Sequence, residues 1–442
     1  MKINFKKHQR IIALIAFMFV IFLVFNLLDP LLLWDENAYL GNARSHLTTS
    51  NYTEDFRFPL LEWIIAAVWF ITGESIFIAK LTIILFSLGI ILLMYLISKE
   101  FFPENAFLLS SIFSFSFPFL FWGFRVYTEI PALFFIMLSF YLLTKEKTGI
   151  AGLIMGFAFL TKFQLAIFAF SAICIYLYKK EFKKTLIFSA FFIIAILPWL
   201  IYNYVVYHNF FWDFIAQYKM VISGTSWQYV DKGMINLFYS IGLMVLFLPF
   251  GIYSMSKNLK KKKANVLILL FYTILSFIYY NFFVKAKDIR YYLFYTPFLI
   301  IISYEGFNCL KKLKKLGLIL IIFSMVLGLT AGIVAISKAG YCSRSGAIIQ
   351  SIEYLRPLVN QNDTVISNYW PWPGYYLNVK AFSVWTDDLD ELNLIYHHKY
   401  FAINDRVGYP ADLKIFNSTK VKLEKELIGK CGDKSWIYRN TA

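Results

Sequence analysis

Long apolar runs, separated by short polar segments, make up most of the chain. Many of these runs approach the roughly 20 residues that a helix needs to cross the hydrocarbon core of a membrane. The first run is too long for the apolar part of a signal peptide, and no small-residue cleavage site follows it, so we expect it to remain as the first span. The pattern predicts eleven membrane-spanning helices, near residues 11–28, 80–98, 105–122, 130–144, 148–162, 163–178, 184–202, 235–256, 264–283, 290–308 and 316–336.

Two places in this pattern allow more than one interpretation. Residues 60–72 are apolar, but if they crossed the membrane, every later loop would change sides. We therefore expect them to lie at the membrane interface, or to dip in and return, as a juxtamembrane helix. The spans 148–162 and 163–178 are short, and they could form one bent hairpin with Lys162 at its outer tip.

The charged residues are few and unevenly placed. Only 16% of the 442 residues are charged and 59% are hydrophobic, whereas about a quarter of a soluble domain is charged. Twenty of the 43 basic residues lie in short clusters between apolar runs with only four acids, and these clusters account for the whole net charge of +16. With the N-terminus in the cytoplasm, every cluster falls on the cytoplasmic side, as the positive-inside rule requires. The pattern predicts a multi-pass integral protein of the cell membrane and gives no reason to expect nucleic-acid binding.

The C-terminal segment differs sharply in composition from the rest. Charged residues are dense there, short apolar stretches at 364–367 and 400–403 alternate with turn residues, and 345–358 has helical periodicity. The sequence therefore predicts two domains. Residues 1–337 would form a helical transmembrane domain, and residues 338–442 a small α/β domain on the extracytoplasmic side.

Ionisable side chains beside apolar runs are costly unless they are solvated, paired or used, and all the candidates fall on the predicted outer side. In the first outer loop, Asp35 and Glu36 lie near Tyr39, and adjacent carboxylates suit a base that deprotonates a hydroxyl group. The same acids could simply favour the start of a helix through its dipole. Arg57, at the end of that loop, could simply pair with a neighbouring acid.

Later segments add a third carboxylate and further cations. Glu129 follows Arg125 in a turn between two spans and directly precedes an apolar run. Lys162 lies inside a long apolar region on the outer side; snorkelling would explain it, and a point charge also suits a phosphate oxygen. Arg290, followed by Tyr291, lies at the start of the tenth span and places another cation on the outer side. A basic residue there departs from the positive-inside rule, and an anionic ligand would explain its position.

This set of side chains suits transfer of a group from a lipid phosphate. Phosphate leaves readily once cations neutralise it, so no general acid is required. One carboxylate is enough to activate the incoming hydroxyl group, and a hydrophobic groove between helices would hold the lipid tail.

The order of these motifs resembles that of the GT-C membrane glycosyltransferases, in particular the group of dolichyl-phosphate-mannose protein mannosyltransferases and bacterial aminoarabinose transferases that modify lipid A. The resemblance covers the whole chain and rests on five short motifs in a consistent order. They are Asp35-Glu36 with Tyr39, Arg57-Phe58-Pro59-Leu60, Thr128-Glu129-Ile130-Pro131, Leu160-Thr161-Lys162, and Arg290-Tyr291 with Pro297. The chain departs from the group at Phe58, where a second proline is usual, and at Phe163-Gln164, where Gly-Pro is usual.

The resemblance implies an inverting transfer of a sugar from a polyprenyl- or dolichyl-phosphate donor to a hydroxyl of a protein, lipid or glycan, within membrane lipid. It implies Asp35 as the base, with Glu36 or Glu129 as its partner. It also implies that Arg57, Lys162 and Arg290 contact the donor phosphate, with Tyr39, Arg125 and Tyr291 as further substrate contacts.

Three questions stay open at this point. No paired metal-ligand spacing occurs, so no metal site is predicted, although a divalent ion bound by carboxylates is compatible with the sequence. Cys342 and Cys431 both lie in the C-terminal segment, where a disulfide bond is permitted. A transporter or flippase of a lipid-linked glycan is the alternative function, although transporters favour inverted repeats and midplane charges. Asparagine-linked oligosaccharide transfer and a non-catalytic scaffold are further alternatives; the Trp-Trp-Asp-Tyr-Gly motif of the former is absent.

Overall fold

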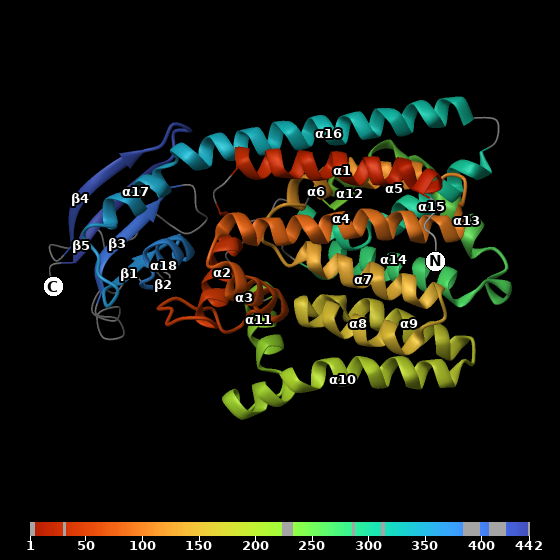
Figure 1. The fold of residues 1–442 in the computed structure, drawn as a ribbon, viewed down its shortest axis with the longest axis horizontal. Coiled ribbons are helices and arrows are strands. Elements are labelled where there is room, and N and C mark those ends of the chain that lie inside the picture. Colours follow the sequence, from red (N-terminus) through yellow and green to blue (C-terminus); the bar gives the residue numbers. More distant parts are fainter. Residues whose placement is uncertain are drawn as a thin grey trace.

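The computed structural model describes residues 5–29, 32–222, 233–284, 288–310, 314–382, 398–405 and 421–440. It consists of a bundle of helices with a small sheet domain at one end (Figure 1). Among the described residues, six helical segments are long and apolar enough to cross a membrane. They contain α1 (Phe5–Leu28), α4 (Ile76–Phe101), α10 (Phe182–Tyr207), α12 (Gly233–Ile241) with η2 (Gly242–Phe247) and α13 (Leu248–Ser256), α14 (Ala264–Ile278) with η4 (Tyr279–Phe283), and α16 (Lys314–Ser345).

Shorter helices fill the remaining predicted spans, so each predicted span coincides with one helix or with successive helices. They are α5 (Ala106–Ser114), α6 (Phe117–Trp122), α7 (Glu129–Thr144), α8 (Thr148–Thr161), η1 (Phe163–Leu165) with α9 (Ala166–Tyr178), and η5 (Ile289–Phe294) with α15 (Thr296–Cys309). The 14 residues of α8 reach only about 21 Å, less than the roughly 30 Å hydrocarbon core. Lys162 separates α8 from η1 in an extended conformation, which agrees with the predicted bend at this residue.

Three further helices lie at the end of the bundle that faces the sheet domain (Figure 1): α2 (Trp34–Ser45), α3 (Leu60–Thr72) and α11 (Trp212–Ile222). The predicted juxtamembrane segment 60–72 is thus a helix, α3, which packs against α2. Side chains near its end, such as Phe70 and Ile71, are more than 80% exposed. Such apolar exposure is expected where a surface meets lipid.

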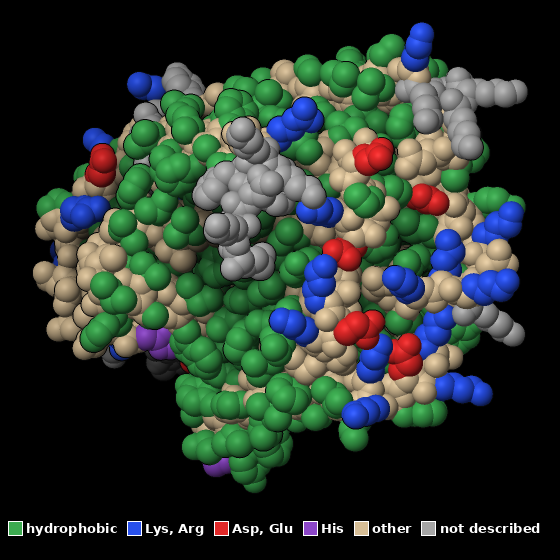
Figure 2. Space-filling view, turned by 45° about the vertical axis from the view of Figure 1, so that its right-hand side comes forward, with side chains coloured by type: hydrophobic (Ala, Val, Ile, Leu, Met, Phe, Trp, Pro, Cys, Tyr) green, Lys and Arg blue, Asp and Glu red, His purple; other side chains and the backbone are tan. Residues whose placement is uncertain are grey.

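Basic side chains gather on the opposite end of the bundle (Figure 2). There, Lys145 pairs with Glu100 at 2.6 Å, and Lys184 pairs with Glu146 at 2.6 Å. The chain is therefore an integral membrane protein whose helix ends are sorted by charge. Which end faces the cytoplasm, and on which side the sheet domain lies, remain predictions.

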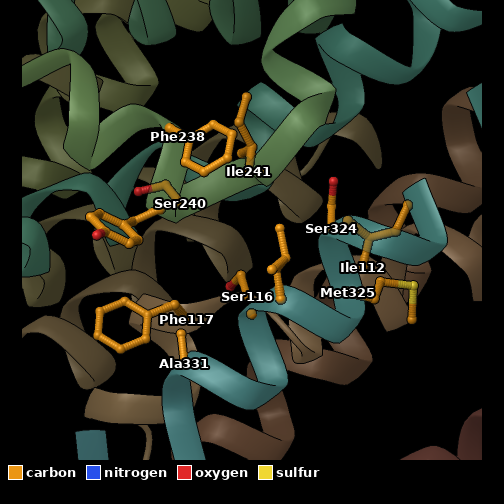
Figure 3. Close-up of a pocket in the computed structure, with 13 residues that line it drawn as sticks. Ile112, Ser116, Phe117, Phe238, Ser240, Ile241, Ser324, Met325 and Ala331 are labelled. Atoms are coloured by element: carbon orange, nitrogen blue, oxygen red, sulfur yellow. The ribbon is translucent and has the colours of Figure 1, made fainter. Parts of the chain in front are cut away.

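Two helices that the apolar pattern predicts as continuous are interrupted where they face α16. The span 105–122 breaks at Phe115–Ser116 because Pro118, near the start of α6, lacks the amide hydrogen that would continue the helix. The span 235–256 breaks at Gly242, whose φ of +59° suits glycine and whose Cα faces Ser324 of α16. A narrow crevice of about 110 Å³ lies between the two breaks and α16 (Figure 3). This volume is well below the several hundred Å³ of a typical ligand pocket.

The C-terminal domain is a small α/β unit, as the composition predicts. The strands are β1 (Thr364–Ser367), β2 (Lys380–Phe382), β3 (His398–Asn404), β4 (Val421–Ile428) and β5 (Lys434–Asn440), in the order β2-β1-β3-β5-β4 within the described residues. The pairs β1–β2 and β1–β3 are parallel, and β3–β5 and β4–β5 are antiparallel. The helices α17 (Ala347–Leu355) and α18 (Pro371–Leu377) complete the domain.

Tryptophans join this domain to the bundle. Trp34, the first residue of α2, packs edge-on against Trp370 at 4.7 Å and Trp372 at 5.4 Å between ring centroids. α16 continues to Ser345, through the predicted boundary after residue 337, which remains a prediction. Cys431 is disulfide-bonded, whereas the side chain of Cys342 lies outside the described part of the structure.

Candidate functional site

Asp35 lies between two arginines that come from distant parts of the chain. Its Oδ1 accepts a hydrogen bond from Arg57 Nη2 at 3.1 Å, and its Oδ2 accepts one from Arg290 Nη1 at 2.6 Å. Burial alone would raise the pKa of this carboxyl, but the Arg57 and Arg290 guanidiniums outweigh it and hold the pKa well below its ordinary value. Asp35 is therefore ionised at neutral pH, and its side chain is 20% exposed.

Arg57 is fixed by contacts on both sides of its guanidinium. Its Nε donates to Glu54 Oε2 at 2.7 Å, and the guanidinium lies over the Tyr39 ring at 4.6 Å from the centroid. Glu54 Oε1 accepts from Tyr52 Oη at 2.6 Å and from Trp370 Nε1 at 3.1 Å. Arg57 thus pairs with a neighbouring acid, Glu54, which was the simpler of its two sequence interpretations. It also contacts Asp35.

Glu129 and Lys162 form a buried ion pair beside this group. Glu129, the first residue of α7, is fully buried, and one of its oxygens contacts Lys162 Nζ. The ammonium of Lys162 lies 4.8 Å from the Tyr291 ring centroid and 5.5 Å from that of Phe294. Lys162 does not snorkel, because its side chain points to Glu129 and is only 12% exposed.

Arg290 joins the two halves of the site. Its Nη1 holds Asp35, while its Nε lies 3.6 Å from Glu129 Oε1 and 3.3 Å from Asp288 Oδ2. Asp288 caps η5 by accepting from the Arg290 backbone amide at 3.0 Å. The Nε is buried and has no hydrogen-bond acceptor in suitable geometry among the described residues.

The structure therefore brings together Asp35, Arg57, Glu129, Lys162 and Arg290 in one continuous cluster at the end of the bundle that faces the sheet domain. The tyrosines form its walls. Tyr39 Oη lies 3.4 Å from Thr128 Oγ1, next to Glu129, and the ring of Tyr291 stacks on that of Tyr280 at 5.5 Å. Lys162, Asp35 and Arg290 keep side-chain exposures of 12 to 20%, so the cluster is only partly buried.

Glu36 and Arg125 lie behind this cluster and contact other partners. The two carboxylate oxygens of Glu36 accept from the backbone amides of Leu33 and Val126, each at 2.7 Å. Arg125 is fully buried and pairs with Asp29 at 2.5 Å. The Glu36 contact ties the start of α2 to the segment before α7, and the Arg125 contact ties the end of α1 to the same segment, so both support the backbone that carries Asp35 and Glu129.

Two residues of this supporting network were not singled out from the sequence. Lys80 in α4 is buried and donates to the backbone carbonyl of Asp29 at 2.7 Å. The sequence did offer a signal for both residues, because Lys80 lies at the beginning of one predicted span and Asp29 lies just after the end of another. Separately, the described residues contain no group of three or more His, Cys, Asp and Glu side chains that could hold a metal ion.

Comparison with known proteins agrees with this arrangement. Residues 57–202 match the family model described as dolichyl-phosphate-mannose-protein mannosyltransferase, and this segment contains Arg57, Glu129 and Lys162. A comparison with curated protein sequences finds no match.

Solved structures share the fold over nearly the whole chain. ArnT from Cupriavidus metallidurans bound to undecaprenyl phosphate is similar with a TM-score of 0.70 at 10% identity, over 97% of this chain and 98% of ArnT. The Archaeoglobus fulgidus oligosaccharyltransferase, in complex with Zn and sulfate, is similar with a TM-score of 0.58 at 13% identity, over 96% of this chain and 72% of that one. The arabinofuranosyltransferase AftD from Mycobacteria is similar with a TM-score of 0.51 at 9% identity, over 97% of this chain and 40% of that one. The predicted resemblance to the GT-C group and the predicted fold class are confirmed.

Proposed function

We propose that this chain is a membrane glycosyltransferase that takes a sugar from a polyprenyl- or dolichyl-phosphate donor and passes it to a hydroxyl group on the extracytoplasmic side. The observation that carries the proposal is the cluster of five side chains from five separate segments at one end of the bundle: Asp35, Arg57, Glu129, Lys162 and Arg290. The family match to residues 57–202 and the likeness to ArnT bound to undecaprenyl phosphate support the choice of donor.

The donor phosphate would bind on the cationic side of the cluster. Arg57 and Arg290 present planar guanidiniums suited to two phosphate oxygens, and Lys162 supplies a compact third charge. The Nε of Arg290 faces the carboxylates of Asp288 and Glu129 at 3.3 and 3.6 Å, so the phosphate would meet the Nη side of this guanidinium. In this arrangement the arginines exchange part of their contact with Asp35 for contact with the phosphate.

Asp35 would then act as the base for the acceptor. The acceptor oxygen forms a bond to the anomeric carbon while the bond from that carbon to the donor phosphate oxygen breaks, and the electron pair leaves with the lipid phosphate. The acceptor proton passes to Asp35, so one displacement inverts the anomeric configuration. Glu129 acts as the partner that holds Lys162 and Arg290 in place, and neither Glu36 nor Arg125 is needed at the reacting atoms, given their contacts elsewhere.

The membrane arrangement belongs to the same proposal. With the N-terminus in the cytoplasm, the basic end of the bundle faces inward, and the cluster and the C-terminal domain face outward. Residues 1–337 form the transmembrane catalytic domain and 338–442 the extracytoplasmic domain. The acceptor is a hydroxyl group of a protein, lipid or glycan.

Incubation of the purified chain in lipid nanodiscs with a panel of polyprenyl-phosphate sugars and candidate acceptors would test the proposal. We expect free polyprenyl phosphate to appear with the right donor and acceptor, and Asp35→Asn to reduce its release by about 10²- to 10⁴-fold. Asp363→Asn is the matched control, since this aspartate lies in the C-terminal domain, where it contacts Lys399 at 3.4 Å. Full activity of Asp35→Asn would remove the base assignment. An inert wild type that instead moves a labelled lipid-linked sugar across vesicles would favour the flippase.

A further inference from the structure

An open cleft of about 600 Å³ lies where the bundle meets the C-terminal domain. Its walls come from the last turn of α1, the first turn of α4, and the C-terminal domain, and none of the residues in the proposed transfer site lines it. Arg44, at the last turn of α2, and Arg356, just after α17, both face it. Asp35 lies in the first turn of the same α2, about 14 Å away along the helix axis, so the cleft is a separate place on the molecule.

The two arginines of the cleft differ in their pairing. Arg44 is satisfied by the protein, because its Nε and Nη2 contact Glu74, the latter at 2.5 Å, and its Nη1 donates to the Tyr375 carbonyl at 2.9 Å. The guanidinium of Arg356 is exposed and makes no hydrogen bond or ion pair within the described parts of the chain. Since Arg44 neutralises Glu74, Arg356 leaves the cleft with a surplus positive charge.

A second donor points to the same kind of ligand. Asn26, near the end of α1, is only 3% exposed and lines the cleft, and its amide Nδ2 has no acceptor among the described residues. An unpaired buried amide is costly in the absence of a partner, because it loses its water without gaining an acceptor. One anionic group in the cleft would satisfy both Asn26 and Arg356.

The flanks of the cleft are apolar and face outward. Leu27 of α1 is 64% exposed and Phe77 of α4 is 44% exposed, and both line the opening. Leu27 lies at the end of α1 and Phe77 at the beginning of α4, so both lie at the boundary that we expect between hydrocarbon and headgroups. A ligand of this cleft therefore needs an anionic head beside an apolar tail.

We propose that this cleft binds the phosphodiester headgroup of an anionic membrane phospholipid. The phosphate accepts hydrogen bonds from Arg356 and Asn26, and the first part of an acyl chain lies along Leu27 and Phe77. The bound lipid fills the space between the bundle and the C-terminal domain and fastens the two together at the membrane surface.

Native mass spectrometry of the delipidated full chain tests this site. We expect the wild type to retain phosphatidylglycerol in preference to phosphatidylcholine, and Arg356→Gln to bind it roughly fivefold more weakly, the effect of one arginine near an anionic lipid. Asn26→Leu should weaken binding in the same direction. Arg439→Gln is the matched control, because this arginine of the same domain is exposed and lies outside the cleft.

Several results would overturn the proposal. One is equal retention of the two phospholipids, and another is an equal loss of phosphatidylglycerol binding in Arg356→Gln and Arg439→Gln. A third is displacement of the lipid by inorganic phosphate at the same concentration, which would make a free anion the ligand. Asp35→Asn should bind phosphatidylglycerol as the wild type does. The test is therefore independent of whether the chain transfers a sugar.

Discussion

Glu62 tests whether burial of a carboxyl group near the proposed site makes the stability of the protein depend on pH. It lies in the first turn of α3 and is 4% exposed, with its Oε1 accepting from Asn42 Nδ2 at 2.7 Å and its Oε2 at 3.9 Å from His46 Nε2. Burial raises the pKa of this carboxyl from 4.5 to about 7, although the contacts from His46 and Asn42 act in the opposite direction. Glu62→Gln keeps the side-chain volume and the oxygen that Asn42 contacts, and it removes the titration.

The sign of the effect follows from proton binding in the two states. The folded protein keeps the proton on Glu62 up to about pH 7, whereas the unfolded chain releases it near 4.5, so stability is lost as the pH rises through this interval. At about 1.4 kcal/mol for each pH unit, the loss reaches at most about 3.5 kcal/mol. Glutamine resembles the protonated acid at every pH. Glu62→Gln should therefore gain most over the wild type above pH 7, and this gain should disappear as the pH falls below about 4.5.

Thermal unfolding in detergent at several pH values between 5 and 8 measures this gap. Glu353→Gln serves as the control, because Glu353 is an exposed glutamate on α17 and its replacement should shift unfolding by little at any pH. A difference between Glu62→Gln and wild type that does not grow with pH would refute the reasoning. The same conclusion would follow if the variant were less stable at pH 8.

Three further substitutions test the site and the packing. Lys162→Gln leaves Glu129 buried without this ion pair and should lower the free energy of unfolding, measured by chemical unfolding, by about 3 kcal/mol. A second substitution in the same chain, Glu129→Gln, should restore part of this loss. Arg57→Lys keeps the charge but loses the planar fork that contacts two carboxylates, and should reduce kcat/KM roughly tenfold with the donor lipid. Gly251→Ala places a methyl group against the Ile302 carbonyl and should cost about 1 to 3 kcal/mol, visible as a lower unfolding temperature.

The order and ends of the helices were predictable because the membrane imposes them. Runs of apolar residues must form helices in hydrocarbon, since every backbone group needs a partner within its own segment. The helix breaks were harder to predict. Pro118 lies only three residues after Phe115, inside an apolar run, and the turn at Gly242 depends on the close approach of Ser324 from a helix far along the chain. Hydrophobicity alone carries no information about either contact.

The gathering of the candidate site residues at one end of the bundle, away from the basic clusters, was also predictable, but the direction in which each side chain points was not. Asp35 and Glu36 are neighbours in sequence, yet successive residues of a helix point about 100° apart. One of them therefore faces the open cluster and meets two arginines, while the other turns into the bundle and binds two backbone amides. Arg125 and Glu129 also contact different partners, because Arg125 lies in the bend before α7 and pairs with Asp29, whereas Glu129 begins α7 and pairs with Lys162.

The charge pairs of the cluster imply a link between the two substrates of the proposed reaction. Without a donor, the guanidiniums of Arg57 and Arg290 stabilise the ionised form of Asp35, which makes it a poor proton acceptor. A lipid phosphate that draws these arginines toward itself weakens their hold on the carboxylate, and the pKa of Asp35 rises toward its ordinary value. In the proposed mechanism, Asp35 thus becomes an effective base only when the donor is in place. Such coupling disfavours proton abstraction from an acceptor that has no sugar to receive.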